Sequence, residues 1–425
     1  MPQLSRSLFC AAAASAASLA LATPASARSD RVATRLPLVT IDAREKIAGD
    51  PKITARMRVA DRRGRRLNRL GDRPNAYRGR IGIEVRGHWS QTWDKKSFAV
   101  ETRDRDGDDR EVPLLGLPRE SDWVLHATHG DRSLVRNTLA FAATRRMGRY
   151  APRLRYVELV LNGRYHGVYM LVEPLEIGKR RIAAGDEAVL MELTQPDKVS
   201  SGDEAFSTAT SGALVSYADP DPDDLPAEQK VGMRALVDRF DAALHSPLAA
   251  DPSQGWRRWL DERSAVDYIL LQELFRNQDA FFGSTHFHAR TGGRLVFGPP
   301  WDFDLSLGNA ATPWFNSPTG WILSSRAWVT QLKDAGLRRS LLERWRQLRA
   351  RGLRESLLAT LDRRAPRLRA PARRNFARWP ILQSGVFPDQ PPRGSYRAEV
   401  RATRRWLERR FAVLDRDLAV AAEAP

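Results

Sequence analysis

Three aspartates between residues 273 and 304 are the clearest candidates for chemistry. The segment ELFRNQDAFFGSTHFHARTGGRLVFGPPWDFD begins in a predicted helix that ends near Asn277, so Asp279 lies in the turn after it. Two short predicted strands then lead to Asp302 and Asp304. Carboxylates at a helix end and at a strand end can converge on one cleft. Phosphoryl transfer uses such an arrangement, because one carboxylate orients the attacking hydroxyl and another holds Mg²⁺ against the phosphates.

A structural role for each aspartate is the alternative. Aspartate is common at helix ends and turns, where it caps backbone N–H groups, and this explains Asp279 taken alone. Asp302 lies between Trp301 and Phe303. A carboxylate between large aromatic side chains is costly to bury unless it is paired or bound to a metal. Asp302 is therefore the stronger functional candidate of the two.

A pair of lysines follows the predicted strand that ends at Arg86. In the segment IEVRGHWSQTWDKKSFAVE, Lys95 and Lys96 begin the next strand, and a lysine amine there could reach phosphate oxygens. Paired lysines also fit an exposed strand edge. If the strand extends back this far, Lys96 shares the apolar face of Phe98 and Val100, and Lys95 is solvated. We therefore expect Lys96 at the phosphates, although a bulge would reverse the order.

Five segments, taken in order, resemble the spore coat protein H (CotH) kinase family. They are RGHWSQTWDKKSF, LLGLPRESDWVLHATHGDRSLVRN, VELVLNGRYHGVYMLVE, ELFRNQD and GPPWDFDLSLGN. The resemblance implies an atypical bilobal protein-kinase-like fold. It also implies transfer of phosphate from ATP, with Mg²⁺ or Mn²⁺, to a Ser or Thr hydroxyl of a protein substrate.

The resemblance also implies roles for single residues. Asp279 matches the family's catalytic aspartate and Asp302 its metal-binding aspartate, while Lys95 or Lys96 matches its nucleotide-binding lysine. Glu173 ends the hairpin that would lead into the connection beside the adenine. Further matches to recurrent family positions, without a derived role, are Arg86, Asp131, Arg136 and Asn137.

The sequence departs from the protein-kinase pattern in three ways. It has no G-x-G-x-x-G loop, so we expect the turn from Arg86 to Ser90 to cover the phosphates. Ser284 stands where conventional kinases place an Asn for a second metal, and Asp304 could compensate. The predicted helix 133–147 has no Glu to pair with the lysine, which leaves Glu173 and Glu192 as candidates.

Apolar spacing predicts an α+β fold. Residues 28–185 form a β-rich N-terminal lobe with one helix, and residues 186–425 form a mainly helical C-terminal lobe that carries the aspartates. A hairpin is expected at Asn162-Gly163. Strands are predicted at 36–43, 81–85 and 97–101, and helices at 133–147, 227–246, 263–277, 328–349, 353–364 and 396–418.

The N-terminus predicts export. Arg6 precedes an apolar stretch from Leu8 to Ala22, and Ala25-Ser26-Ala27 fits a signal peptidase. We expect residues 1–27 to be removed and the mature chain to be soluble in the periplasm or outside the cell. The single cysteine, Cys10, would leave with the signal, which excludes disulfides, thiolate nucleophiles and Cys-ligated zinc.

The formal net charge is +18, from 69 Lys and Arg against 51 Asp and Glu. Arginines are scattered over both halves with acidic residues among them, which argues against a dedicated nucleic-acid groove. Weak contact with anionic polymers or lipid headgroups stays open. The oligomeric state and the acceptor are not encoded in any recognisable pattern.

Two alternatives compete with a kinase. One is a catalytically inactive relative that binds a cell-surface or coat partner, which the missing Gly-rich loop and the scarcity of ATP outside the cytoplasm favour. Both key aspartates are nevertheless present. The other is a metal-dependent hydrolase using His286 and His288, but no H-E-x-x-H pattern accompanies them. A Ser-His-Asp hydrolase would need a G-x-S-x-G elbow, which the sequence lacks.

Overall fold

The computed structural model describes residues 32–423, except 63, 65, 201, 327–331, 333 and 388. The expected signal at 1–27 lies outside these residues. Among the helices that the structure describes, none combines the length and apolarity needed to cross a membrane. Helices and strands are both abundant, which confirms the α+β class.

The N-terminal half forms a closed barrel with strand order β10-β11-β9-β6-β5-β3-β2. Alternation builds it: in β3, Ala55, Met57 and Val59 face a buried interior, while Arg56 and Arg58 are exposed. Parallel pairing of β2 with β10 closes the ring. The strands are β2 (Leu38–Ala43), β3 (Ile53–Ala60), β5 (Tyr77–Arg86), β6 (Ser97–Arg103), β9 (Asp122–His126), β10 (Leu154–Leu161) and β11 (Arg164–Val172).

The predicted hairpin at Asn162-Gly163 is confirmed. β10 and β11 pair antiparallel on either side of it, and Asn162 and Gly163 have φ angles of 49° and 70°. Both residue types tolerate this left-handed conformation, which the tight turn requires. Short pairs of strands lie outside the barrel: β1 (Ala33–Thr34) with β4 (Asn68–Arg69), and β7 (Val112–Pro113) with β8 (Arg119–Glu120).

A second sheet follows the barrel, with strand order β13-β14-β12-β15-β16. The sequence predicted only its last hairpin. Its central strand β12 is buried along nearly its whole length, so it reads as a continuous apolar run without the alternation that marks a half-exposed strand. The strands are β12 (Ala188–Leu193), β13 (Ala205–Ser207), β14 (Leu214–Asp219), β15 (Thr285–Arg290) and β16 (Val296–Phe297).

Helices dominate the rest of the C-terminal half. Among the described residues they are α2 (Ala227–Leu244), α3 (Glu262–Phe275), α4 (Pro313–Asn316), α6 (Ala335–Ala350), α7 (Leu353–Arg378) and α8 (Tyr396–Glu423). Helix α1 (Arg136–Arg146) belongs to the N-terminal half, between β9 and β10. The helix expected from residue 133 starts at Arg136, because Leu134 has a φ of 61°. Of the helix expected at 328–349, residues 328–331 and 333 lie outside the described residues. Helix α6 begins at Ala335, where the Asp334 side chain accepts from the backbone N–H of Leu337.

Helix α7 continues past the end predicted at residue 364. It contains Pro366 and Pro371, which normally end a helix. Its apolar face nevertheless runs on beyond them through buried Leu368, Ala372 and Phe376. Tertiary packing against β11, α1 and α8 therefore outweighs the local cost of the prolines.

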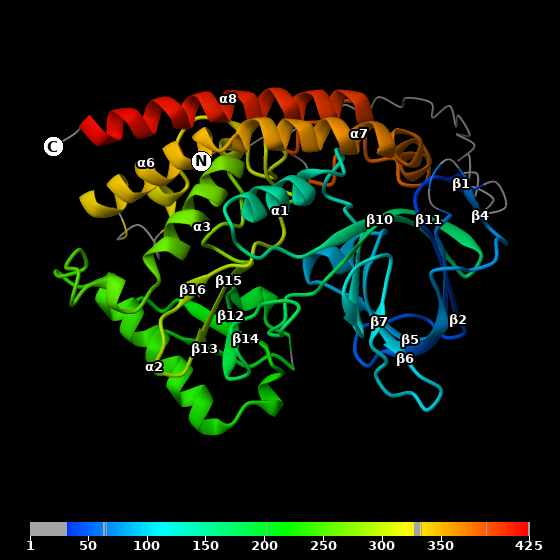
Figure 1. The fold of residues 1–425 in the computed structure, drawn as a ribbon, viewed down its shortest axis with the longest axis horizontal. Helices are drawn as coiled ribbons and strands as arrows, with labels where there is room; N and C mark the ends of the chain where they lie inside the picture. Colours follow the sequence, from blue (N-terminus) through cyan, green and yellow to red (C-terminus); the bar gives the residue numbers. More distant parts are fainter. Residues whose placement is uncertain are drawn as a thin grey trace, which may run out of the picture.

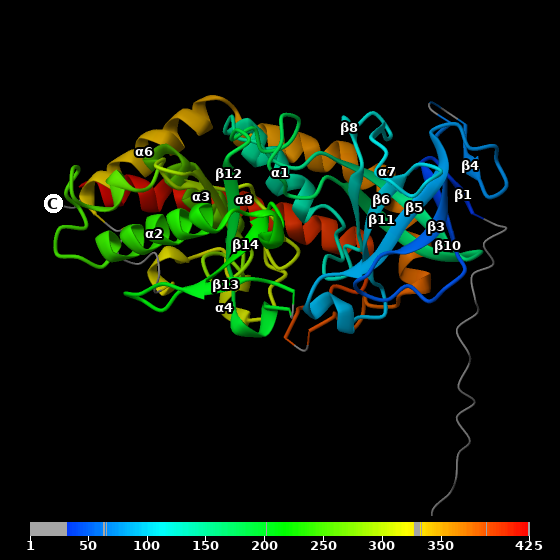
Figure 2. The same ribbon diagram turned by 90° about the horizontal axis from the view of Figure 1, so that it is seen from below.

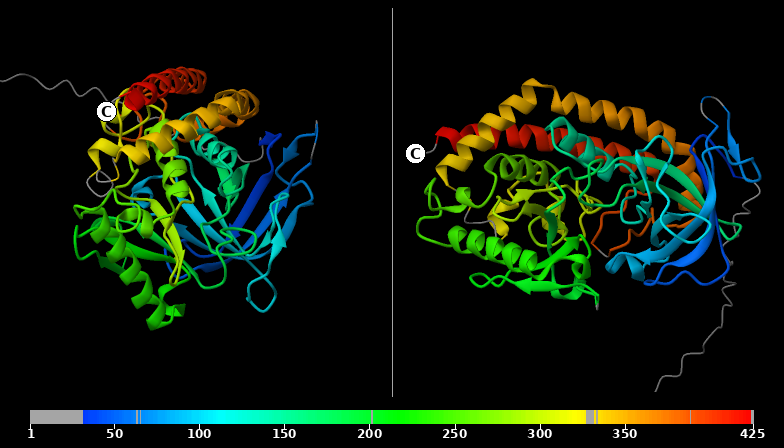
Figure 3. Two further views of the ribbon diagram at one scale, coloured as in Figure 1. Left: turned by 60° about the vertical axis from the view of Figure 1, so that its left-hand side comes forward. Right: turned by 60° about the horizontal axis from the view of Figure 1, so that its bottom comes forward.

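The long helices α7 and α8 lie together along one side of the molecule and extend from the second sheet to the barrel (Figure 1, Figure 3). Figure 2 shows the barrel strands, in blue, at one end and the second sheet, in green, at the other. One apolar core joins the outer face of β10 and β11 with the helices and the second sheet. The barrel interior is a separate core. The barrel is thus fixed to the helical half by shared packing.

Candidate active site

A cleft of about 790 Å³ lies between the barrel and the second sheet. Ends of β5 and β9 line one side, and β12, β15 and the turns around residues 279 and 302 line the other. Segments far apart in the sequence meet here. The sequence-predicted residues that line the cleft are Arg86, Glu192, Asp279, Ser284, His286, Asp302 and Asp304.

Asp279 lies in the turn after α3, as the sequence predicted. The helix ends at Phe275 because Arg276 takes the left-handed conformation, with a φ of 43°. Burial raises the pKa of Asp279 to about 6, and the negative charge of Asp302 acts in the same direction. A carboxylate with a pKa closer to neutrality is a better acceptor for a hydroxyl proton.

The turn that carries Asp302 and Asp304 is held on both sides by asparagines. Asn137 Nδ2 donates to Asp304 Oδ1 at 2.5 Å, and Asn137 Oδ1 accepts from the backbone N–H of Phe303 at 2.8 Å. Asn277 Nδ2 donates to the backbone carbonyl of Asp302 at 3.2 Å. Asp302 itself has a φ of 55°, a conformation that Asp and Asn tolerate better than most residues. These contacts fix the backbone of the turn and the direction of the Asp304 carboxylate.

The start of α1 anchors the same turn. Arg136 is fully buried, and its Nε donates to the backbone carbonyl of Ser306 at 2.8 Å. Its guanidinium also pairs with Asp131, whose carboxylate accepts from the backbone N–H of Arg136 at 2.8 Å. Asp131, Arg136 and Asn137 are therefore positioning residues, which gives a physical role to three positions that the sequence left without one.

The carboxylates fit a hard divalent cation. Ligand atoms of Asp302, Asp304 and His126 all lie within 4.8 Å of one another. Burial, together with the charges of Asp302 and Asp131, raises the pKa of Asp304 well above its usual range. A cation between the carboxylates would relieve this repulsion. Carboxylate oxygens are the ligands that Mg²⁺ and Mn²⁺ prefer.

His126 places a neutral imidazole ring beside the carboxylates. Its Nδ1 accepts from the backbone N–H of Thr128 at 3.1 Å, so the neutral ring carries its proton on Nε2. Burial lowers the pKa of His126 to about 4, which keeps the ring neutral near pH 7. With this hydrogen bond intact, the ring offers no lone pair to a metal. The metal donors are then the two aspartates.

A family model describes this chain. Residues 83–414 match the model of the CotH kinase protein family, and the match includes every residue of the cleft named above. The chain belongs to the CotH kinase family. A comparison with curated proteins gave no match. The CotH match starts within β5, so β1, β2, β3 and β4 precede it.

Arg86 brings a positive charge to the CotH cleft. Its guanidinium lies over the ring of Trp301, 5.5 Å from the ring centroid. Burial lowers its pKa, and the charges of Glu84, Glu192 and Asp302 oppose that effect. A guanidinium beside the carboxylates can bind phosphate oxygens that a metal also neutralises.

The expectation that Lys95 is solvated is wrong. Its side chain is 1% exposed, and its Nζ donates to the carbonyls of Ala127 and Val168, each at 2.6 Å, and to Asn375 Oδ1 at 2.9 Å. The alternation argument failed because β6 begins at Ser97, so the strand does not extend back to either lysine. Burial lowers the pKa of Lys95 to about 7, while Asp304 acts in the opposite direction.

Lys96 and Glu173 also lie away from the cleft lining. Lys96 is half-buried, and its Nζ donates to the backbone carbonyl of Gln91. Glu173 is fully buried and accepts from the hydroxyl of Tyr150 at 3.1 Å and from the backbone and guanidinium of Arg153 at 2.7 and 2.9 Å. The structure therefore places Glu173 in a structural ion pair. Neither glutamate candidate pairs with Lys95, whose side-chain partner is Asn375.

Glu192, Ser284 and His286 share one wall of the cleft. The backbone N–H of Ser284 donates to Glu192 Oε1 at 2.9 Å, and His286 Nε2 lies 3.5 Å from Glu192 Oε2. Within the described residues, the cluster of metal-ligating residue types around Asp302 and Asp304 includes neither His286 nor His288. This arrangement does not favour the hydrolase alternative.

Sequence reasoning missed His126 as a member of the carboxylate cluster. It is the last residue of β9, directly after the apolar Trp123-Val124-Leu125. A polar residue at the end of a buried strand was the available signal. Its partner aspartates are far away in the sequence, so only the barrel's position against the second sheet brings them together.

Proposed function

We propose that this protein is an exported kinase that transfers the terminal phosphoryl group of ATP, bound with Mg²⁺ or Mn²⁺, to a Ser or Thr hydroxyl of a protein substrate. The carrying observation is the convergence of Asp279, Asp302 and Asp304 with Arg86 on one cleft. The two-lobed kinase-like arrangement belongs to this proposal: the barrel acts as one lobe and the second sheet with its helices as the other.

Asp279 acts on the acceptor. Its carboxylate orients the attacking hydroxyl and takes its proton as the new bond to phosphorus forms. The raised pKa, about 6, suits this role because the group is still largely ionised at neutral pH yet accepts a proton readily. Its position in a turn fixed by α3 keeps it near the carboxylates of the neighbouring turn.

Asp302 and Asp304 would hold the divalent cation, whose chemistry is to neutralise charge on the phosphate oxygens. Asn137 keeps the Asp304 carboxylate in place by a hydrogen bond of 2.5 Å. Arg86 provides a second positive charge for the phosphates. The turn from Arg86 to Ser90, most of which lines the cleft, takes the place of a Gly-rich loop.

Lys95 lies outside the cleft lining and contacts the backbone behind one of its walls. Two of its three acceptors belong to the barrel backbone, and one of these, Ala127, lines the cleft. Its third acceptor, Asn375, lies on α7. The ammonium therefore fixes the barrel wall of the cleft to the long helix, and its three N–H groups are all engaged. This makes Lys95 a positioning residue in the proposed mechanism.

Intact-mass spectrometry of the purified mature chain after incubation with Mg-ATP or Mn-ATP tests the reaction. We expect added mass equal to phosphate, abolished in Asp279→Asn. Added mass equal to a nucleotide would show that the protein catalyses nucleotidyl transfer and not phosphoryl transfer. No added mass, together with no metal-dependent ATP binding, would overturn the kinase proposal in favour of an inactive relative that binds a surface partner.

Export has its own test. N-terminal sequencing of the protein recovered from cells should give a chain beginning at or near Arg28 in the periplasm or the medium. An intact Met1 on most of the protein would contradict export.

A further inference from the structure

Arginines face one another across the outer surface of the barrel. In the antiparallel pairing of β3 with β5, Arg56 lies directly opposite Arg80, and Arg58 lies opposite Arg78. Arg80 is also opposite Arg103 on β6. Like charges in these positions destabilise a sheet. A face selected only for stability and solubility would alternate the signs of its charges.

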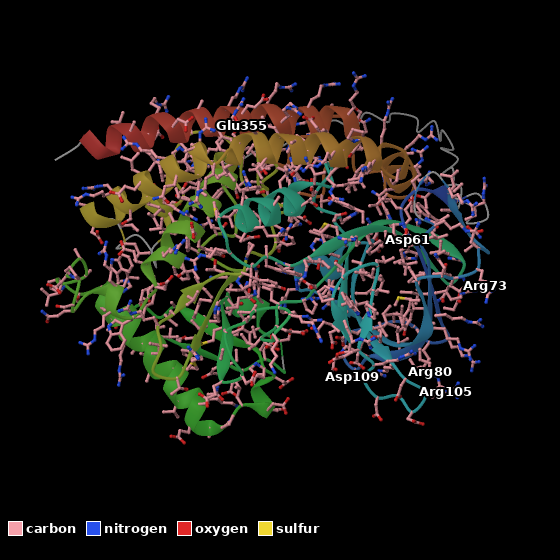
Figure 4. The ribbon with its side chains drawn as sticks, in the orientation of Figure 1. Asp61, Arg73, Arg80, Arg105, Asp109 and Glu355 are labelled. Atoms are coloured by element: carbon pink, nitrogen blue, oxygen red, sulfur yellow. The ribbon has the colours of Figure 1, made fainter. Side chains whose placement is uncertain are left out.

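These side chains line a groove of about 840 Å³. The outer face of the strands forms its floor, and the loop after β6 forms a wall, near the labelled Arg80, Arg105 and Asp109 in Figure 4. Seven arginines and three aspartates line it. The arginines are Arg56, Arg58, Arg78, Arg80, Arg103, Arg105 and Arg110.

The acidic side chains leave much of this charge uncompensated. Asp42 binds Arg58 at 2.8 Å, and Glu101 binds Arg103 at 2.5 Å. Arg56 and Arg78 are exposed and, among the residues that the structure describes, form no ion pair or hydrogen bond through their guanidinium groups. Their donors are available to a ligand.

The groove is separate from the CotH cleft. Arg80 and Arg86 lie on the same strand, and at about 3.3 Å per residue their backbones are roughly 20 Å apart. The groove arginines Arg56, Arg58, Arg78 and Arg80 also precede Ile83, where the family match begins. The groove is therefore built largely on strands outside the matched segment.

The chemistry of the lining defines the ligand. Guanidinium groups bind phosphate with two parallel hydrogen bonds. Neighbouring strands lie about 4.8 Å apart and alternate residues about 7 Å apart along a strand, so the array can contact several phosphates in succession. Among the residues that the structure describes, no aromatic side chain lines the groove. Stacking of bases, on which single-strand nucleic-acid binders rely, is therefore missing.

We propose that this groove binds a linear phosphate-bearing polymer through its phosphates, without recognising bases. Inorganic polyphosphate, a polyol-phosphate polymer and the backbone of a nucleic acid share this chemistry. The groove would hold the enzyme on such a polymer while the cleft stays open.

Fluorescence anisotropy with labelled inorganic polyphosphate tests the proposal on the mature chain. The test variant is Arg56→Gln/Arg80→Gln, and the matched control is Arg338→Gln/Arg339→Gln, which removes two exposed arginines from α6. We expect the test variant to bind about tenfold or more weakly at moderate salt, with a salt dependence reduced by about two counterions. The control should bind like the unmodified chain.

Three results would overturn the proposal. Equal weakening in both variants would show diffuse attraction by the net charge. Much tighter binding of a single-stranded oligodeoxynucleotide than of polyphosphate of equal charge would show base recognition. Binding to anionic phospholipid vesicles without binding to polyphosphate would show a membrane contact. Comparable affinity for polyphosphate and oligonucleotide supports recognition of phosphate alone.

Two further measurements separate binding from folding and from catalysis. Removing two like charges from opposed positions should leave the Tm of the test variant unchanged or slightly higher, so weak binding cannot reflect misfolding. Metal-dependent ATP binding should be unchanged, because neither residue lines the cleft. Binding of polyphosphate to the groove does not depend on the kinase proposal, so the loss of binding in the test variant would stand even if the protein transferred no phosphate.

Discussion

Glu273 and the three aspartates of the cleft form two contrasting groups of carboxylates, which differ in how their negative charges are compensated. Glu273, in α3, is fully buried and accepts from the backbone N–H groups of Ile322 and Leu323 at 3.0 and 2.7 Å and from Arg410 at 3.0 Å. In the cleft nearby, the charge of Asp302 raises the pKa of both Asp279 and Asp304, in addition to the effect of burial. Burial raises the pKa of Glu273 as well, but there Arg410 and the backbone N–H groups act in the opposite direction.

The difference separates structural from functional acids. A buried carboxylate that receives a full set of donors and an arginine serves the fold. Carboxylates that lie close together beside a cleft, with too few hydrogen-bond donors, repel one another, and the rest of the fold keeps them in place. Such carboxylates are suited to bind a cation or a substrate. The contrast predicts that substitutions in the two groups act on different properties.

The largest expected effect is on turnover. Asp279→Asn should lower the rate of phosphate transfer by about 10²- to 10⁴-fold, because the amide cannot accept the hydroxyl proton. Asp203→Asn is the matched control, since Asp203 also lines the cleft and lies on its rim. Quench-flow or steady-state phosphate transfer measures both. A rate for Asp279→Asn close to that of the control would remove Asp279 from the mechanism.

Glu273→Gln should instead act on stability. It leaves Arg410 buried without its charge partner, at a cost of about 3 to 5 kcal/mol in the free energy of unfolding. Urea denaturation measures the loss. The double variant Glu273→Leu/Arg410→Met should recover only part of it, because neither charge remains buried but the backbone N–H groups of Ile322 and Leu323 lose their acceptor. If the single variant is as stable as the unmodified chain, the contrast between the two groups fails.

Lys95 and Lys96 allow the same comparison between a structural and a more exposed charge to be made for cations. Lys95→Met removes three hydrogen bonds from buried acceptors and should cost about 2 to 3 kcal/mol in unfolding free energy. Lys96→Met should cost little, because its half-buried ammonium contacts only a backbone carbonyl. Thermal denaturation compares them. A loss of ATP affinity in Lys95→Met without a loss of stability would mean that this ammonium turns to the phosphates.

Asp304→Asn should have the smallest effect on stability, and it should increase stability where the other substitutions decrease it. In metal-free buffer it should raise the free energy of unfolding by about 1 kcal/mol, because it removes a charge that Asp302 and Asp131 repel. Adding Mg²⁺ should stabilise the unmodified chain more than this variant. A strong loss of stability in metal-free Asp304→Asn would contradict the repulsion among the carboxylates of the cleft.

Local patterns predicted much of what local forces determine. The hairpin at Asn162-Gly163 and the end of α3 depend on residues close in sequence. Closure of the barrel between β2 and β10 depends on a parallel pairing across most of the N-terminal half, which no local signal encodes. The fully buried strand β12 has no alternation to reveal it.

In the candidate site, too, the sequence predicted what depends on neighbouring residues and missed what depends on distant ones. Asp279 and Asp302 could be found because their turns have distinctive neighbours. The place of Lys95 could not, because it depends on where β6 starts and on Asn375, which comes from the far end of the chain. His126 joins the carboxylates only through the docking of the barrel on the second sheet.

Metal-dependent nucleotide binding tests the central claim most directly. Isothermal titration calorimetry should show that the unmodified chain binds ATP with Mg²⁺ or Mn²⁺ and binds it weakly with EDTA. Asp302→Asn keeps a residue that tolerates the φ of 55° but removes the charge, so metal-dependent binding should be lost while the fold remains. Asp279→Asn should still bind. Equal affinity for ATP in the unmodified chain and in Asp302→Asn, with and without metal, would contradict the account.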